Sequence, residues 1–246
     1  MASRAGRVVT GILGLLGELM ITVGLLIAGY LAWDVWWDSN ASAAIAVEAV
    51  EEFKETLVAA PRQKAELITD RPPPEMEPVA EGETMGILIV PKWYDKTMNQ
   101  MPIKEGTTPY VLDRAAAGHY KDTALPGEVG NFSVAGHRRT HGNSFRFINE
   151  LEAGDQIIVS TDTTWLVYEV TDYEIVLPSA IEVVAPVPGK PDEVPVDRYL
   201  TMTTCHSPQT GEWGNSHRWV THSKLIGWMD RADGMPEQVL VDPEVK

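Results

Sequence analysis

The longest apolar stretch of the chain runs from Val8 to Trp33 and contains one charged residue, Glu18. A helix of this length, at about 1.5 Å per residue, is longer than the roughly 30 Å hydrocarbon core of a bilayer. Two arginines precede the stretch, whereas Asp34 and Asp38 follow it. Because basic residues favour the cytoplasmic side, this pattern predicts a transmembrane anchor with a cytoplasmic N-terminus and an extracytoplasmic remainder.

A cleaved signal peptide is the alternative, since Ala41-Ser42-Ala43 fits the small-residue pattern of a cleavage site. However, the apolar stretch is much longer than that of a signal peptide, and a segment rich in tryptophan separates it from this site. We therefore expect an uncleaved anchor. Glu18 is costly in lipid, so it is either protonated, turned toward a partner helix, or functional.

Two segments of different character follow the anchor. Residues 45–58 carry apolar side chains close to helical spacing, with glutamates and a lysine between them, and predict an amphipathic helix. This helix could be a free stalk or could pack on the domain that follows. Residues 70–84 contain four prolines and no apolar period, which is typical of a stiff, extended linker.

Beyond residue 84 the chain consists of short runs rich in β-branched and aromatic residues, separated by Gly, Pro and Asp. The lack of alternation with long helices argues against a βαβ fold and favours an all-β barrel or sandwich of about 160 residues. Asp162-Thr163 is expected to form a hairpin turn, and residues 144–151 a short helical turn. The expected strands are 86–90, 131–137, 156–161, 164–177, 199–205 and 217–226.

Composition and charge exclude several classes of function. The apolar fraction of 44% is sufficient for a core and excludes wholesale disorder. With 20 basic against 35 acidic side chains, the net charge of −15 repels phosphate backbones and argues against a nucleic-acid partner. Cys205 is the only cysteine, so an intrachain disulfide and zinc sites that need two or more cysteines are impossible.

Cys205 ends a strand-like run rich in threonine. A lone cysteine is more often an inert, buried thiol. Here its neighbours are hydroxyl side chains, and an idle reactive thiol outside the cytoplasm is a liability, so both features weigh against an inert thiol. A lone cysteine with histidines elsewhere in the chain is a known pattern for such a nucleophile.

Several histidines could serve this thiol. His206 is adjacent to Cys205, but neighbours on a strand point to opposite faces. His137 ends an apolar run, and Gly136 beside it permits the close approach of a ligand or another backbone. We therefore favour His137 and leave open the remaining candidates, His119, His141 and His222.

Arg218 begins a predicted strand on which it shares one face with Val220 and His222. A guanidinium beside a Cys–His pair could hold a substrate backbone or stabilise an oxyanion. From spacing alone, an ordinary surface arginine is the better interpretation.

These residues also carry a family resemblance. Thr201-Met202-Thr203-Thr204-Cys205, followed by Arg218, resembles the TLTTC…R signature of sortases, the cysteine transpeptidases of Gram-positive cell surfaces. The segments leading to His137 resemble those that precede the sortase histidine, namely 118–120 (GHY), 124–132 (ALPGEVGNF) and 134–138 (VAGHR). The continuation through Thr140, Gly142, Phe145 and Gly154-Asp155 is similar to class E sortases of actinobacteria.

The resemblance implies a role for each residue of the motifs. Cys205 is expected to be the nucleophile, His137 the general acid and base, and Arg218 the group that positions substrate and stabilises the oxyanion. Thr204 and Tyr120, which lie inside the matched motifs, are expected to contact the substrate. The resemblance also implies a closed eight-stranded sortase-type β-barrel with short helices.

The implied reaction is cleavage of a Thr–Gly bond in a C-terminal sorting signal, LPxTG in general and LAxTG typically in class E. The acyl group passes through a cysteine thioester to an amine of a peptidoglycan precursor or of a pilin. The expected partners are therefore surface proteins that bear this signal, an amine acceptor and membrane lipid. No metal or organic cofactor is implied.

The anchor and the resemblance together predict a single-pass membrane protein with its catalytic domain outside the cytoplasm. The expected divisions are a cytoplasmic tail (1–7), the anchor (8–33), a helical stalk with a Pro-rich linker (34–84), the catalytic barrel (85–230) and a C-terminal tail (231–246).

The chain departs from the family pattern at two places. Arg218 lies thirteen residues after Cys205, farther than is usual, so the loop 207–216 is enlarged. His141 stands where class E more often has an aromatic residue. Two alternatives remain: a sortase-like module that has lost turnover and serves as a binding or scaffold protein, and an L,D-transpeptidase. The second is disfavoured because Thr203-Thr204, rather than Ser-His-Gly, precede the cysteine.

Overall fold

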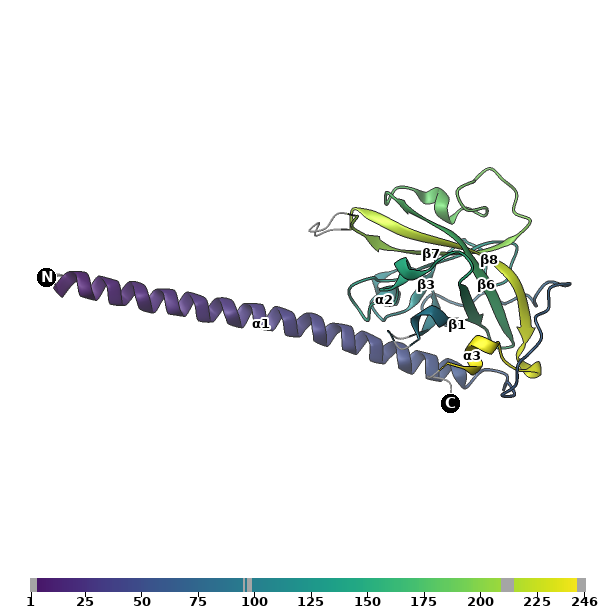
Figure 1. Ribbon diagram of the computed structural model, residues 1–246, viewed down its shortest axis with the longest axis horizontal. Coiled ribbons are helices and arrows are strands. Elements are labelled where there is room, and N and C mark those ends of the chain that lie inside the picture. The colour runs from purple at the N-terminus through teal and green to yellow at the C-terminus, as the bar shows by residue number, and fades with distance from the viewer. Residues whose placement is uncertain (1–3, 95, 97–98, 209–214, 243–246) are drawn as a thin grey trace.

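The computed structural model describes residues 4–94, 96, 99–208 and 215–242. It consists of one long N-terminal helix, α1 (Arg4–Lys54), that projects from a β-barrel (Figure 1). From Gly11 onward the side chains of the apolar stretch, such as Leu19 and Leu25, are exposed, and none of the described residues of this stretch is buried within the protein. Its mean hydropathy of 2.1 and its length are those of a helix able to cross a membrane.

The C-terminal part of α1 packs on the barrel, so of the two possibilities for this amphipathic helix the structure shows the packed one. Ser42, Ala46, Ala49 and Val50 are buried, mainly against strand β2 (Gln100–Glu105). Their small side chains allow the helix axis to approach the sheet closely. No turn or break separates this packed part from the apolar part of α1.

The barrel is closed and contains eight strands in the order β1-β2-β3-β4-β7-β8-β6-β5, which confirms the expected fold. The β2–β3 and β4–β7 pairs are parallel, and the other pairs are antiparallel. Apart from β2, the strands are β1 (Thr84–Ile89), β3 (Ala117–His119), β4 (Gly130–Ala135), β5 (Gln156–Ser160), β6 (Thr164–Val176), β7 (Arg198–His206) and β8 (His217–Asp230).

Short helices connect the strands. Asp162 and Thr163 form the tight turn between β5 and β6, as the sequence predicts, and the expected helical turn near residue 148 is a 3₁₀ helix. The short helices are η1 (Pro91–Trp93), α2 (Pro109–Leu112), η2 (Ile148–Glu150), η3 (Ile181–Val184), η4 (Arg231–Asp233) and α3 (Glu237–Leu240).

The barrel interior is filled by side chains from most of the strands, which alternate between the core and the outer face. On β4, Phe132 and Val134 enter the core, and on β7, Leu200 and Met202 do so. The core also receives Phe145 from the loop that follows β4.

The segment between α1 and β1 lies along the barrel without regular helix. Lys64 forms an isolated bridge with Met235, and Ile68 forms one with Trp228. The Pro-rich part, residues 70–83, likewise lacks helix, and Met76 packs against the core.

Arg231 joins this segment to the base of the barrel. Its guanidinium donates to the Val58 carbonyl oxygen at 2.9 Å and to the Ser160 hydroxyl at 2.8 Å, and it lies 4.0 Å from the centre of the Trp165 ring. Burial lowers the pKa of Arg231 to about 10. The arginine thus fixes the chain just after α1 to the barrel.

Candidate active site

Cys205 lies near the end of β7, where its direct cross-strand partner on β8 is Arg218. Directly opposed residues of an antiparallel pair project to the same face of the sheet. Cys205 is half-buried. The guanidinium of Arg218 donates to the carbonyl oxygens of Asn215 and His217, both at 3.0 Å. These bonds hold the cation on the strand beside the thiol.

His137 follows β4, the strand that pairs in parallel with β7. The last paired residues of β4 and β7 are Ala135 and Thr203, and the Gly136 amide donates to the Thr203 carbonyl at 3.1 Å. His137 lies two residues beyond this pair on its chain, and Cys205 lies two residues beyond it on β7. His137, Cys205 and Arg218 therefore belong to the same end of three neighbouring strands.

The thiol is on the outer face of the sheet. Because Leu200 and Met202 point into the core, alternation places Thr203 and Cys205 on the opposite face. His206 then points with the core-facing set. Its imidazole meets the Trp219 ring edge-on at 5.4 Å. The sequence-based argument against His206 as the partner of Cys205 agrees with this arrangement.

Burial and the charge of Arg138 both oppose protonation of His206. A guanidinium N–H of Arg138 donates to Nδ1 of His206, and the guanidinium lies 5.7 Å from the centre of the Trp219 ring. Burial, followed by the nearby charge of Arg138, lowers the pKa of His206 below its usual value. The neutral imidazole with its proton on Nε2 is therefore the favoured form.

A tight loop carries His137 away from β4. The Phe145 amide donates to the His137 carbonyl at 2.8 Å, which closes the loop 137–145. A Cβ on Gly136 would lie 2.8 Å from the Phe145 ring, so only glycine fits beneath that aromatic ring. The sequence suggested that Gly136 permits a close approach, and the structure identifies the approaching group as Phe145.

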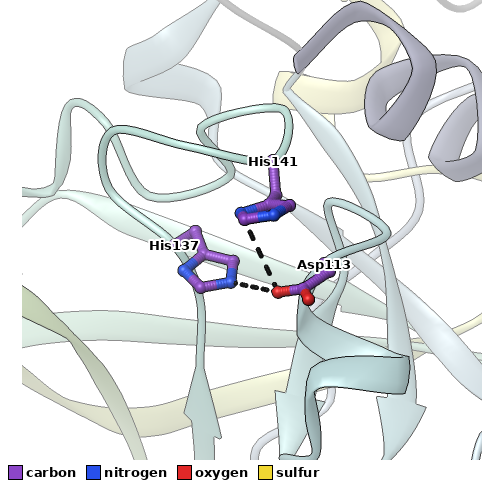
Figure 2. A group of neighbouring side chains, drawn as sticks. All are labelled: Asp113, His137 and His141. Carbon is purple, nitrogen blue, oxygen red and sulfur yellow. Dashed lines mark hydrogen bonds and ion pairs between the residues drawn. The ribbon is translucent and has the colours of Figure 1, made fainter. Parts of the chain in front are cut away.

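Two residues from other segments contact the His137 ring (Figure 2). Nε2 of His137 lies 2.8 Å from Oδ1 of Asp113, which directly follows α2. The imidazole of His141 lies over it, with ring centres 4.8 Å apart. Among the described residues, these three form a group whose possible metal-ligand atoms all lie within 4.8 Å of one another. Sequence reasoning missed Asp113, since no spacing links it to His137.

The two expected substrate-contacting residues make hydrogen bonds within the protein. Thr204 is buried, and its hydroxyl donates to the Gly136 carbonyl at 2.6 Å, which ties the end of β4 to β7. The Tyr120 hydroxyl shares a 2.8 Å hydrogen bond with that of Thr203, on the same outer face as Cys205. Direct contact between either residue and a substrate stays a prediction.

The other candidate histidines are engaged by carboxylates of their own. His119 is buried, with Nδ1 at 2.6 Å from Glu105. His222 lies on β8 with Nδ1 at 2.9 Å from the Thr201 hydroxyl and Nε2 at 3.1 Å from Glu174. His137 instead follows the end of β4 that lies beside the Cys205 end of β7, and its role as the partner of Cys205 stays a prediction. The enlarged loop lies largely outside the described residues, which omit 209–214.

Comparisons with known proteins identify the relatives of this chain. A family model described as "Sortase domain" matches residues 93–226. Sortase SrtE1 of Streptomyces coelicolor is 33% identical over 232 residues, which are 92% of this chain and 60% of that relative. The chain thus spans less than two thirds of the length of this relative.

Two solved structures show the same fold. The SrtA sortase from Actinomyces oris is 59% identical, with a TM-score of 0.68 over 72% of this chain and 98% of that one. Sortase E from Streptomyces avermitilis is 34% identical, with a TM-score of 0.57 over 65% of this chain and 99% of that one. The similarity to class E sortases expected from the motifs is confirmed.

Proposed function

The chain belongs to the sortase family of cysteine transpeptidases, and from this membership we propose that it cleaves a Thr–Gly bond in a C-terminal sorting signal and transfers the acyl group to an amine. The signal is of the LAxTG or LPxTG type. The observation that supports the proposal is the pairing of three neighbouring strands, at one end of which the chain carries His137, Cys205 and Arg218.

The first half-reaction forms a thioester. The Cys205 thiolate attacks the threonine carbonyl carbon, and the carbonyl oxygen becomes an oxyanion that the Arg218 guanidinium stabilises. As the C–N bond breaks, protonated His137 gives its proton to the leaving glycine amine. Because Asp113 holds Nε2 of His137, we assign this proton transfer to Nδ1.

The second half-reaction returns the enzyme to its starting state. An amine of a cell-wall precursor or of a pilin attacks the thioester carbonyl, and His137 accepts the proton that this amine loses. The C–S bond then breaks and releases the Cys205 thiolate, while a new amide links the protein to its acceptor. Arg218 stabilises the oxyanion of this step as well.

Helix α1 supports a location at the membrane. Its apolar part is fully exposed and long enough to span a bilayer, and the arginines at positions 4 and 7 precede it. We therefore propose a single-pass protein with a cytoplasmic tail at 1–7, an anchor at 8–33 and a catalytic domain at 85–230 outside the cytoplasm. Since residues 42–50 pack on the barrel, the segment 34–84 serves as a rigid connection between anchor and domain.

Paired peptide kinetics test the proposal. Peptides that differ only in Leu-Ala-x-Thr-Gly against Leu-Pro-x-Thr-Gly should both be cleaved after threonine, the alanine peptide at least as well as the proline peptide. A marked preference for proline would contradict the class E specificity. Mass spectrometry of the enzyme with the better peptide should show a Cys205 thioester that hydroxylamine removes. An enzyme that neither cleaves nor reacts with a thiol-reactive mimic of the sorting peptide would instead be a binding or scaffold module.

A further inference from the structure

Asp113, His137 and His141 form a compact group of side chains (Figure 2). Nε2 of His137 lies 2.8 Å from Oδ1 of Asp113, and Nδ1 of His141 lies 3.8 Å from the same oxygen. Two imidazole nitrogens and one carboxylate oxygen are a ligand set of zinc sites that keep a fourth position open. The proposed reaction uses His137 directly and Asp113 to hold its Nε2 atom, and it leaves the position of His141 unexplained.

His141 supplies an independent observation that points to a cation. Its Nδ1 atom is buried and has no hydrogen-bond partner among the described residues. The Asp113 oxygen that it faces is too far away for a hydrogen bond. On the other side of the ring, Nε2 lies 3.4 Å from Oδ2 of Asp38, on α1. If the proton of the neutral imidazole is on Nε2, which faces Asp38, the Nδ1 lone pair is directed at Asp113 and His137.

The backbone holds His141 in this place against its conformational preference. His141, Gly142 and Asn143 have φ angles of 50°, 80° and 56°, three successive left-handed residues of which only one is glycine. A Cβ on Gly142 would lie 2.4 Å from that of Ala115. The loop is therefore wedged against the segment that follows Asp113, and the ring of His141 is directed over that of His137.

We propose that Asp113, His137 and His141 bind a divalent ion of the zinc class, and that this ion switches the enzyme off. With metal–ligand bonds of about 2.0–2.1 Å, tetrahedral geometry places ligand atoms about 3.3 Å apart. The separations of the two histidine nitrogens from the Asp113 oxygen, 2.8 and 3.8 Å, lie on either side of this value. Asp38, which contacts the far side of the His141 ring, would orient that ligand in the way that carboxylates orient metal-bound histidines.

The inhibitory effect rests on the proposed function, whereas binding of the ion does not. Histidine binds such an ion as the neutral imidazole, through a nitrogen that carries no proton. With Nε2 of His137 on the ion, the single ring proton is on Nδ1. The metal-bound ring cannot become the imidazolium that gives a proton to the leaving amine, and it has no free lone pair with which to accept the proton of the incoming amine. The ion thus blocks both proton transfers without touching the sulfur.

Cobalt binding tests the site directly, because Co²⁺ gives visible absorption bands that report nitrogen and oxygen ligands in a four-coordinate site. The full chain is purified in detergent with an affinity tag that contains no histidine, freed of metal with a chelator, and titrated with Co²⁺ alone. We expect one equivalent to bind and to be displaced by Zn²⁺. The affinity should fall at least tenfold in His141→Gln, His141→Ala and Asp113→Asn.

Two further variants serve as controls. Glu174→Gln removes a carboxylate beside His222, the same change as Asp113→Asn at another place on the barrel, and should leave Co²⁺ binding and peptide cleavage unchanged. Cys205→Ala should retain Co²⁺ binding. Thermal melting of each variant shows whether it is folded, and the two His141 variants and Asp113→Asn give three separate tests of the site.

The outcomes separate this proposal from the function on which its second half rests. Zn²⁺ should inhibit peptide cleavage, and a chelator should restore it. In His141→Gln the Zn²⁺ concentration for half-inhibition should rise at least tenfold. The rate of each variant is compared with its own metal-free rate. Binding lost in Cys205→Ala but kept in His141→Gln would place the ion on the thiol and overturn the proposal. The absence of any Co²⁺ spectrum would overturn it too. A chain that binds Co²⁺ through His141 but cleaves no peptide would refute the proposed function alone.

Discussion

Cys205 and Arg218 are directly opposed on β7 and β8, next to the last pair of this antiparallel ladder. Their side chains project to one face. The strand register therefore places the proposed nucleophile and the proposed oxyanion-stabilising cation opposite one another, although the loop between them is longer than is usual in the family. The loop begins only beyond the His206–His217 pair, so its enlargement leaves the Cys205–Arg218 pair intact.

Arg218→Lys should reduce kcat/KM by about 100-fold or more, since an ammonium cannot reproduce the planar, two-point contact of a guanidinium with an oxyanion. Paired rates with one peptide measure the effect. Arg62→Lys, at an exposed position, is the matched control and should be indistinguishable from the unaltered protein. Full activity in Arg218→Lys would remove Arg218 from the proposed site.

His137→Ala should lower kcat by about 10²–10⁴-fold, because it removes the group that protonates the leaving amine. His206→Ala should retain most of the activity, since this ring faces the core-directed side of β7 and is held by Arg138. Cys205→Ala should form no thioester. The proposal fails if His206→Ala is as inactive as Cys205→Ala while His137→Ala still turns over.

The pKa of His206 should lie below 6.5 in the folded protein, because burial and the nearby charge of Arg138 oppose protonation. Its contribution to stability is then fully present above the unfolded-state value and is lost as the pH falls through the folded-state value. An NMR titration of the His206 ring measures this midpoint directly. Arg138→Gln should raise it, and an unchanged midpoint in that variant would contradict the assigned cause.

Gly142→Ala should destabilise the protein far more than Gly154→Ala. Both glycines have left-handed backbones, with φ angles of 80° and 93°, which costs an alanine about 1–2 kcal/mol. Only at Gly142 would the new methyl group also meet another atom, the Ala115 Cβ at 2.4 Å, which adds about 1–3 kcal/mol of overpacking. Urea unfolding of both variants tests the difference. Equal losses of unfolding free energy would show that the loop around Gly142 adjusts to the extra methyl group.

The anchor should remain on the mature protein. The possible cleavage site at residues 41–43 lies inside α1, where Ser42 is 4% exposed and Ala43 approaches Gly142. N-terminal sequencing of protein extracted from membranes should therefore find residues ahead of position 41. A chain that begins at Ala44 would show that α1 is cut before or during folding of the domain.

Six of the eight strands are predicted from runs rich in β-branched and aromatic residues, and two are not. β2 reads Gln-Met-Pro-Ile-Lys-Glu, whose proline and flanking polar residues are untypical of a strand, and β3 has only three residues. Strand pairing cannot be read from such runs, so the parallel β4–β7 pair could be expected only from the family resemblance.

The supporting residues of the site could not be predicted for a related reason. Asp113 and Asp38 contact His137 and His141 from segments far apart in the sequence. Each is one of many acidic residues in the chain, and no motif or spacing distinguishes them. Likewise, the amphipathic pattern of residues 45–58 indicates a helix but not its partner, because an apolar stripe packs equally well on a barrel or on another helix. The division of the chain at residue 84 stays a prediction.

Helix α1 continues without a break from the apolar stretch to Asp38, which touches the loop that carries His141. Asp38 follows Trp33 by five residues, about 7 Å of helix at 1.5 Å per residue. If Trp33 marks the outer edge of the lipid, the thiol works at a fixed and small height above the bilayer. A protein still tethered to that membrane is then confined to the layer in which the enzyme operates, whereas a released protein must return from bulk solution. The enzyme would thus select its substrate proteins by their location at the membrane as well as by their sorting sequence.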